Sequence, residues 1–342
     1  MPQKQFLLGK NLLELEQLTA DFGMPKFAAK QIVHWLYQKR ASSILSMTDL
    51  AIKYRNALAE KYVVGCSAPC TVQVSRDGTK KYLFAIAGEK NAKIESVYIP
   101  DDDRATLCIS SQAGCRMGCT FCMTARMGFV QQLSAGDIVN QIFGIPESAT
   151  LTNLVLMGMG EPLDNMAEVQ KSLEIITAAW GMAWSPTRIT LSTIGVHDGL
   201  RTFLDTTHCH LAISLHSPFD EERRALMPMQ KTYPIAKTLD IIRRYDWTGQ
   251  RRVSFEYILF DGVNDTPKHA TALAKMLQGL ECRVNLIRYH PLPKSELRGA
   301  PKSTVEKFQQ QLKNKGVLTT IRASRGEDIM AACGMLSTKE KM

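Results

Sequence analysis

The sequence predicts an α/β protein, a partial (βα)6-type barrel with an N-terminal helical accessory domain and a small β-hairpin extension. Three observations support this prediction: helical periodicity over residues 1–65, strand-like segments over residues 66–103, and alternating short strands and helices over residues 104–342. Repeated βα units imply a parallel sheet, and this many favour a full or partial barrel. We therefore expect three parts with these boundaries.

The first part contains two amphipathic helical segments separated by Gly23, Met24 and Pro25, which are NLLELEQLTADFG and KFAAKQIVHWLYQKR. Apolar residues recur in both at helical spacing. The second segment is basic and carries Trp35 and Tyr37. That composition fits phosphate contact and base stacking in an RNA-binding domain, and it fits equally a solvated surface over a small helical core.

The second part predicts a β-hairpin extended by a third strand. Its segments are CTVQVS, the turn RDGTK, KYLFAIA and AKIESVYIP. Residues with high β-propensity on either side of an Asp-Gly turn are typical of antiparallel pairing.

The third part contains seven predicted strands, ATLCISS, TNLVLMGMG, RITLST, HLAISLHS, RVSFEYILF, RVNLIRYHP and LTTIRAS. Predicted helices lie between them, including SAGDIVNQIFG, whose Ser134 and Asp137 form a capping-box pattern. Polar residues and glycines follow most strands, namely Ser110 and Ser111, Gly158 to Glu161, Ser192, Ser214 to His216, and Asn285. Loops at the carboxyl ends of barrel strands form active sites, so we predict a site there.

Composition restricts the class of protein and its partners. The hydrophobic fraction of 45% and the charged fraction of 22% are ordinary for a globular protein. No apolar run approaches the roughly 18 residues of a membrane-spanning helix, and the early charges in MPQKQFLLGK do not resemble a secretory signal. We expect a cytoplasmic protein with reduced thiols and no membrane association. The formal net charge of +9 fits a nucleic-acid partner or simply a basic, solvated surface.

Three of the nine cysteines, Cys115, Cys119 and Cys122, lie in GCRMGCTFCMTARMGF after the first barrel strand. A zinc site would need a fourth cysteine or histidine, and no histidine lies near this loop. Three thiolates suit a 4Fe–4S cluster with one open iron, which can bind and reduce S-adenosylmethionine (SAM). The spacing, with Phe121 before the last cysteine, resembles the radical-SAM superfamily, and this implies a 4Fe–4S cluster, SAM and a barrel of the radical-SAM type.

The same resemblance implies SAM-binding roles for residues at the later strand ends. GMGEP resembles the superfamily's glycine motif, in which a glycine lacks the Cβ that would block the methionine amino group. The implied residues are Gly160, Glu161, Ser192, Ser214, Leu215, His216 and Asn285. Each is also common at strand ends for ordinary structural reasons.

Two further cysteines, Cys108 and Cys333, narrow the family. The strings around them and along the chain resemble the RlmN/Cfr rRNA adenine methyltransferases over nearly the whole length. They are IESVYIPDDDRATLCISSQAGCRMGCTFCMT, VLMGMGEPLDN, LAISLHSPFDEERRALMP, EYILFDGVND, VNLIRYHP and TIRASRGEDIMAACG.

The resemblance implies a mechanism and its residues. Cys333 takes a methyl group from one SAM, and a second SAM supplies the radical that removes a hydrogen atom from this S-methyl group. The resulting methylene radical then adds to adenine. Cys108 then resolves the covalent adduct and forms a disulfide with Cys333. Glu95 is the implied proton acceptor, with an exposed strand carboxylate as the alternative interpretation. The family's substrates are an adenine of the peptidyl-transferase centre in 23S rRNA and, in the RlmN branch, the tRNA adenine just 3′ of the anticodon.

Other hypotheses remain open on the sequence. Ser217 and Arg288 stand where many RlmN members have Ala and Pro, as in the Cfr branch, which methylates carbon 8; the remaining strings favour carbon 2. A non-catalytic iron–sulfur or zinc RNA-binding protein would leave the strand-end motifs unexplained. A methylthiotransferase would need a second cluster, which the spacing of Cys66, Cys70, Cys209 and Cys282 does not provide. We further expect a monomer served by an electron donor such as flavodoxin.

Overall fold

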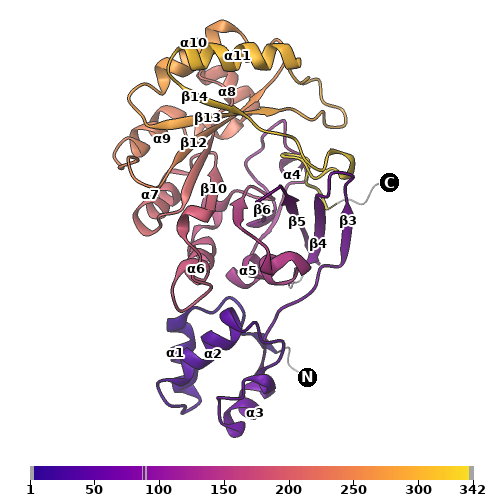
Figure 1. Cartoon of the computed structure of the whole chain (residues 1–342), viewed down its shortest axis with the longest axis vertical. Helices are drawn as coiled ribbons and strands as arrows, with labels where there is room; N and C mark the ends of the chain where they lie inside the picture. The colour runs from indigo at the N-terminus through magenta and orange to yellow at the C-terminus, as the bar shows by residue number, and fades with distance from the viewer. Residues whose placement is uncertain (1–3, 87, 89–90, 339–342) are drawn as a thin grey trace.

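A computed structural model describes residues 4–86, 88 and 91–338 of the 342-residue chain (Figure 1). The strands are β1 (Gln5–Phe6), β2 (Tyr62–Val63), β3 (Thr71–Val74), β4 (Lys80–Ala85), β5 (Lys93–Pro100), β6 (Ala105–Cys108), β7 (Gln112–Gly114), β8 (Phe129–Gln132), β9 (Asn153–Leu156), β10 (Ile189–Thr193), β11 (His210–Ser214), β12 (Val253–Leu259), β13 (Cys282–Arg288) and β14 (Leu318–Ile321). The α-helices are α1 (Leu12–Asp21), α2 (Ala28–Val33), α3 (Ile52–Lys61), α4 (Met123–Arg126), α5 (Ala135–Phe143), α6 (Met166–Thr177), α7 (His197–Thr206), α8 (Asp220–Leu226), α9 (Ile235–Ile242), α10 (Pro267–Met276) and α11 (Lys302–Asn314). No helix in the described ranges is both long enough and apolar enough to cross a membrane.

A ten-stranded sheet organises the molecule, with the order β14-β13-β12-β11-β10-β9-β6-β5-β4-β3. Neighbouring strands from β6 to β14 are parallel. These are the seven strands predicted for the third part, which confirms the α/β fold. The sheet stays open, with β14 and β3 at its edges, and is therefore a partial barrel.

The predicted hairpin and third strand form β3, β4 and β5. Strand β5 pairs antiparallel with β6, and Val97 lies opposite Cys108. The extension therefore continues the barrel sheet. This pairing places Glu95 on the strand next to Cys108.

The N-terminal helices α1 to α3 form a lobe beside α5 and α6 (Figure 1). The lobe has its own apolar core, which includes Leu15, Ile32 and Leu58. After Val33 the second predicted helix widens into a π-helical turn over His34–Gln38. Tyr37 is buried in the core, so of the two interpretations that fit the sequence, this ring supports the small helical core and is not free to stack on a base. The Lys39 amine lies 3.9 Å from the centre of the Trp35 ring.

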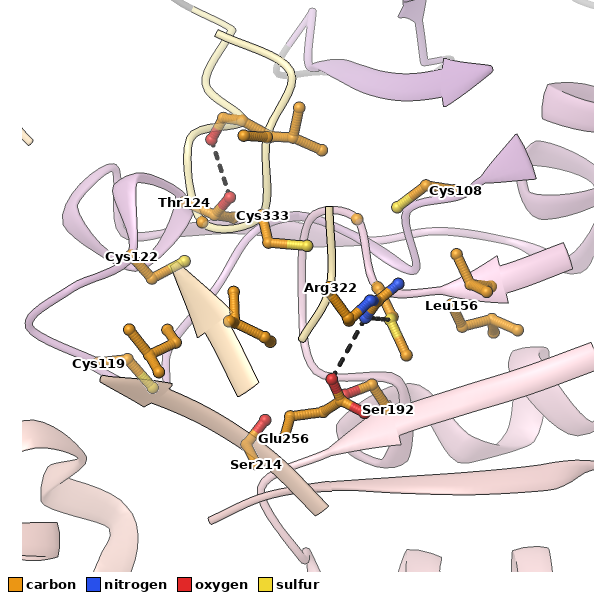
Figure 2. Close-up of a pocket in the computed structure, with 18 of the residues that line it drawn as sticks. Cys108, Cys119, Cys122, Thr124, Leu156, Ser192, Ser214, Glu256, Arg322 and Cys333 are labelled. Carbon is orange, nitrogen blue, oxygen red and sulfur yellow. Dashed lines mark hydrogen bonds and ion pairs between the residues drawn. The ribbon is translucent and has the colours of Figure 1, made fainter. Parts of the chain in front are cut away.

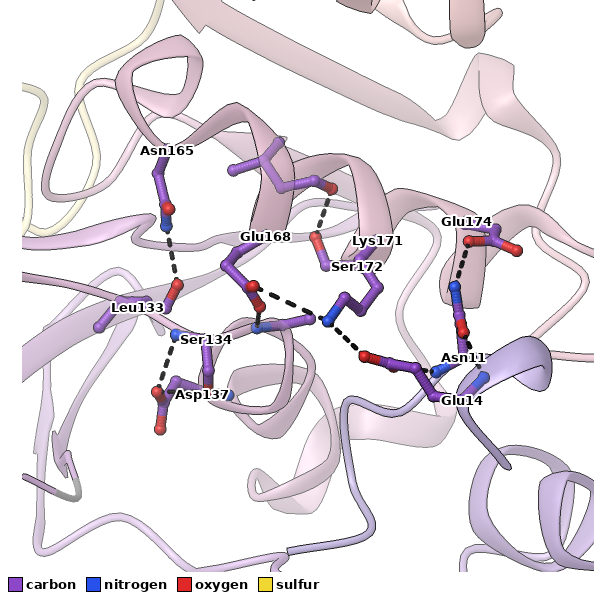
Figure 3. A network of polar contacts seen from close by, with 12 residues as sticks. Asn11, Glu14, Leu133, Ser134, Asp137, Asn165, Glu168, Lys171, Ser172 and Glu174 are labelled. Atoms are coloured by element: carbon purple, nitrogen blue, oxygen red, sulfur yellow. Dashed lines mark hydrogen bonds and ion pairs between the residues drawn. The ribbon is translucent and has the colours of Figure 1, made fainter. Parts of the chain in front are cut away.

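Polar contacts join this lobe to the barrel (Figure 3). Lys171 of α6 forms an ion pair with Glu14 of α1 at 2.9 Å, and the Asn11 amide donates to Glu174 at 3.1 Å. The predicted capping box of α5 is present, because Ser134 accepts from the Asp137 N–H and the Asp137 carboxylate accepts from the Ser134 N–H.

A glycine contact between lobe and barrel predicts a large effect on stability. Gly9 has φ +92°, and a Cβ there would overlap the backbone nitrogen of Gly136 at the start of α5. We expect Gly9→Ala to lower the free energy of unfolding by about 3 kcal/mol, through overpacking and left-handed strain together. Gly23→Ala is the control, since Gly23 has φ +60° but nothing within 4 Å, and we expect a loss of about 1 kcal/mol. Denaturant unfolding of both variants measures the difference; equal losses would contradict the close contact.

Candidate active site

A cavity of about 430 Å³ lies at the carboxyl ends of the parallel strands (Figure 2). Its walls come from the loops that follow β7, β9, β10, β11 and β14, and from β6 and β12. The sequence-predicted residues that line it are Cys108, Cys115, Cys119, Cys122, Gly160, Glu161, Ser192, Ser214, His216 and Cys333. The topology thus brings together residues more than 200 positions apart in the sequence.

The three-cysteine loop runs between β7 and α4 and is supported by a separate ribbon of β7 and β8. The Cys115 N–H donates to the Gly128 carbonyl at 3.1 Å, and the Thr120 N–H donates to the Leu226 carbonyl at 3.0 Å. These contacts fix the loop at both ends. In Figure 2, Cys119 and Cys122 lie on the same side of the cavity that they line.

These thiols fit a 4Fe–4S cluster. Among the described residues, no three Cys, His, Asp or Glu side chains converge on a point where a single metal ion could bind. A cluster does not require such convergence, because each thiolate binds its own iron. Burial raises the pKa of the Cys115 thiol to about 12. A cationic iron centre would hold such thiols in the thiolate form.

The glycine loop after β9 packs closely against the start of β7. Gly160 has φ +100°, and a Cβ there would lie 2.5 Å from the Cβ of Gln112. On the sequence alone, Gly160 is explained by the space that the methionine amino group needs. The structure adds a second reason, which is close packing against Gln112. A valine at this position would therefore displace the loop as well as narrow the cavity.

Glu161 and His216 are buried polar residues of the cavity wall. The Glu161 carboxylate accepts from the N–H groups of Leu163 at 3.1 Å and Ile194 at 3.0 Å. Burial raises its pKa to about 7. His216 accepts through Nδ1 from the Ile258 N–H at 3.0 Å, and burial lowers its pKa to about 3, so the ring is neutral.

Three predicted site residues lie behind the wall. Leu215 is fully buried. The Asn285 amide donates to Glu256 at 2.7 Å, and its oxygen accepts from the Thr320 hydroxyl at 2.6 Å. Glu95 is buried, forms an ion pair with Lys81 at 3.0 Å and accepts from the Ser337 N–H at 2.8 Å. The alternative interpretation of Glu95 as an exposed strand carboxylate is therefore wrong; burial raises its pKa.

Cys108 and Cys333 face the same part of the cavity. Figure 2 shows their side chains pointing toward one another across a gap, with Arg322 beside both. The segment that carries Cys333 rests on the start of α4, directly after the three-cysteine loop, because the Met123 N–H donates to the Gly334 carbonyl at 2.8 Å and the Thr124 hydroxyl to the Leu336 carbonyl at 2.9 Å. All nine cysteines lie within the described residues and are free thiols.

Several charged residues of the wall, among them Glu256 and Arg322, were not predicted from the sequence. Glu256 is a buried residue of β12, and its carboxylate accepts from Arg322 Nη1 at 3.2 Å. A glutamate inside the apolar string SFEYILF is a usable signal, because a buried charge is costly unless it is paired.

Comparisons with known proteins agree with this geometry. Residues 109–273 match the radical SAM superfamily, and residues 6–64 match the ribosomal RNA large subunit methyltransferase N-terminal domain. The chain is 54% identical over 335 residues to a probable dual-specificity RNA methyltransferase RlmN of Bacteroides fragilis, covering 98% of this chain and 97% of the relative. It is 42% identical over 333 residues to the dual-specificity RNA methyltransferase RlmN of Syntrophus aciditrophicus, covering 96% and 95%.

A solved structure shows the same fold. The crystal structure of a radical SAM methyltransferase from Sphaerobacter thermophilus matches with a TM-score of 0.90 and 38% identity, covering 98% of this chain and all of that one. The radical SAM superfamily uses a 4Fe–4S cluster and SAM, which the three-cysteine loop and the cavity fit. The chain therefore belongs to the RlmN family of dual-specificity, radical-SAM RNA methyltransferases.

Proposed function

We propose that this enzyme methylates carbon 2 of one adenine in the peptidyl-transferase centre of 23S rRNA and of the adenine 3′ of the anticodon in tRNA. The observation that carries the proposal is the shared cavity, which gathers the three-cysteine loop, the glycine loop, Cys108 and Cys333. The names of the relatives, dual-specificity RNA methyltransferases, support both the reaction class and two kinds of RNA substrate.

The cluster cysteines Cys115, Cys119 and Cys122 would hold a 4Fe–4S cluster, which supplies the electron that converts SAM into a radical able to remove hydrogen from a methyl group. Gly160, Glu161, Ser192, Ser214 and His216 line the space beside them and would bind SAM. Leu215 and Asn285 would act from behind the wall, by fixing its shape. Two SAM molecules are consumed in each turnover, one for methyl transfer and one for the radical.

Cys333 is the methyl carrier in this proposal. It is an exposed thiol on a segment that borders the cavity, so it can accept a methyl group from SAM and then present that carbon to adenine. The product is a carbon bridge between the Cys333 sulfur and the base. Cys108 is the resolving group: its thiolate attacks the Cys333 sulfur and a disulfide forms. The carbon–sulfur bond breaks, and its electron pair stays on the carbon, which takes up a proton and becomes the methyl group of the product.

In this proposal Glu95 accepts the ring proton that adenine loses when the adduct is resolved. Its pKa is raised by burial, which brings it nearer to the range useful for a general base. In the structure the Glu95 carboxylate forms an ion pair with Lys81 and accepts a hydrogen bond from the Ser337 N–H. Movement of the Cys333 segment would release the second of these contacts.

Two residues, Ser217 and Arg288, differ from the common RlmN pattern, and their positions favour methylation of carbon 2 over carbon 8. Ser217 is buried in the loop between β11 and α8, where its hydroxyl donates to Glu222 at 2.7 Å, and Arg288 faces Glu327 at 3.7 Å. Neither residue lines the cavity. The departures therefore leave unchanged the wall that would face the base.

The three parts have separate roles in the proposal. Residues 1–65 would contact RNA through surface charge, residues 66–103 would extend the sheet that carries Glu95, and residues 104–342 would perform catalysis. The enzyme would act as a cytoplasmic monomer, where its RNA substrates are, with a donor such as flavodoxin supplying electrons.

The test is mass mapping of adenines in 23S rRNA and tRNA from cells with and without this protein. We expect loss of a methyl group at carbon 2 of one rRNA adenine and of the tRNA adenine 3′ of the anticodon. Methylation at carbon 8 that depends on the protein would instead support the Cfr-like alternative. Unchanged RNA in both fractions would overturn the proposed reaction.

A further inference from the structure

Arg322 directly follows β14, and the described residues contact its guanidinium group on one side only. Its Nη1 donates to Glu256 Oε2 at 3.2 Å and contacts Met157 Sδ at 3.4 Å. Glu256 is in turn fixed by Asn285 at 2.7 Å and by the Ser254 hydroxyl at 3.1 Å. The guanidinium is therefore anchored by a buried network.

The other side of this guanidinium faces the cavity. Its Nε and Nη2 donors have no hydrogen-bond partner within the described part of the chain, and the side chain is 34% exposed although Glu256 is only 4% exposed. Arginine keeps its charge at any physiological pH and cannot serve as an acceptor. Unused donors of a fixed cation suit a hydrogen-bond acceptor on a ligand.

The position of the two reactive cysteines identifies that ligand, given the proposed function. Arg322, Cys108 and Cys333 line the same cavity and lie together in Figure 2. The adjoining thiols and Glu256 also raise the pKa of Arg322. Carbon 2 of adenine must meet the carbon carried by Cys333, whose sulfur Cys108 must reach. Carbon 2 is bonded to the ring nitrogens N1 and N3, which are both acceptors.

We propose that Arg322 donates a hydrogen bond to N1 or N3 of the target adenine, and that Glu256 is the positioning residue that aims the guanidinium. This inference rests on the proposed function and adds a substrate-contacting residue to it. Bond formation at carbon 2 increases electron density on the adjacent nitrogens, so a fixed cation there stabilises the adduct more than the free base.

The test is a cycle that combines variants with base analogues. Wild type, Arg322→Ala and Arg322→Lys are assayed on a tRNA anticodon stem-loop that carries adenosine, 1-deazaadenosine or 3-deazaadenosine at the target. Arg288→Ala is the matched control, an arginine near the same sheet edge that pairs with a glutamate but lies outside the cavity. Mass spectrometry of Cys333 and SAM cleavage are measured in parallel.

We expect Arg322→Ala to slow methylation of the adenosine RNA about a hundredfold, with Cys333 methylation and SAM cleavage retained and Arg288→Ala unaffected. The wild-type enzyme should methylate one of the two analogue RNAs more slowly than the adenosine RNA by a similar factor. Arg322→Ala should methylate that analogue RNA only slightly more slowly than it methylates the adenosine RNA. Arg322→Lys should recover part of the rate. Glu256→Gln should reduce the discrimination between adenosine and that analogue, which a merely structural role would leave unchanged.

Three results would overturn the inference. The first is an unchanged methylation rate in Arg322→Ala, and the second is that each analogue slows Arg322→Ala by the same factor by which it slows the wild type. The third is loss of SAM cleavage or of Cys333 methylation in Arg322→Ala. The last would assign Arg322 to SAM. Wild type that fails to methylate the adenosine RNA would contradict the proposed function as well. Wild type that methylates it while the cycle shows independent losses contradicts the Arg322 contact alone.

Discussion

Replacing Cys119 with alanine should abolish both the iron–sulfur chromophore and SAM cleavage. Three thiolates are the minimum that holds a 4Fe–4S cluster with one iron open to SAM, so no protein ligand remains to take the place of the third. Cys119 lies in the middle of a loop that is fixed at Cys115 and Thr120 by backbone hydrogen bonds. The measurement is iron content and visible absorbance after anaerobic reconstitution, with 5′-deoxyadenosine formation in the same samples. Both should fall to background.

Cys70→Ala is the matched control for this experiment. Cys70 is an exposed thiol that does not line the cavity, so the variant should reconstitute and cleave SAM as the wild type does. Thermal unfolding of both variants before reconstitution checks that the fold survives. A Cys119→Ala chain that keeps full iron content would overturn the assignment of the cluster loop.

The barrel and most of its site could be predicted because their signals are local. Each parallel strand is a short apolar run that ends in a polar or glycine residue, and parallel topology places all those ends on one edge. Cys115, Ser192 and His216 therefore line one cavity although at least 24 positions of sequence separate each from the next. The capping box at Ser134 is likewise a signal contained in four residues.

The remaining features depend on contacts between distant segments. Nothing near Glu95 in the sequence indicates that the Ser337 N–H and Lys81 will bury its carboxylate. The sequence predicts Asn285 at a strand end, yet the structure places it in the middle of β13, with its amide directed to Glu256 on the neighbouring strand. Side-chain direction at a strand end depends on the partner strand, and that partner is known only once the sheet order is known.

The two family cysteines should give opposite results when each is replaced with alanine. Cys108→Ala should still form the carbon bridge between Cys333 and adenine and then stall, with protein covalently bound to RNA. The reason is that no other positioned thiol can displace the Cys333 sulfur: Cys66, Cys70, Cys209 and Cys282 do not line the cavity, and the remaining three thiols are the proposed cluster ligands. Cys333→Ala lacks the carrier sulfur and should form no adduct.

Denaturing electrophoresis of each variant purified from cells, before and after ribonuclease treatment, measures the adduct. A nuclease-sensitive band of high mass should appear for Cys108→Ala and be absent for Cys333→Ala and for the control Cys282→Ala, which keeps every cavity thiol. The reverse pattern would exchange the roles of the two cysteines. A band in neither variant, with both still methylating RNA, would exclude covalent catalysis by this pair. Burial raises the pKa of the Cys108 thiol to about 12, so Cys108 is protonated at neutral pH and must lose its proton before it attacks the Cys333 sulfur.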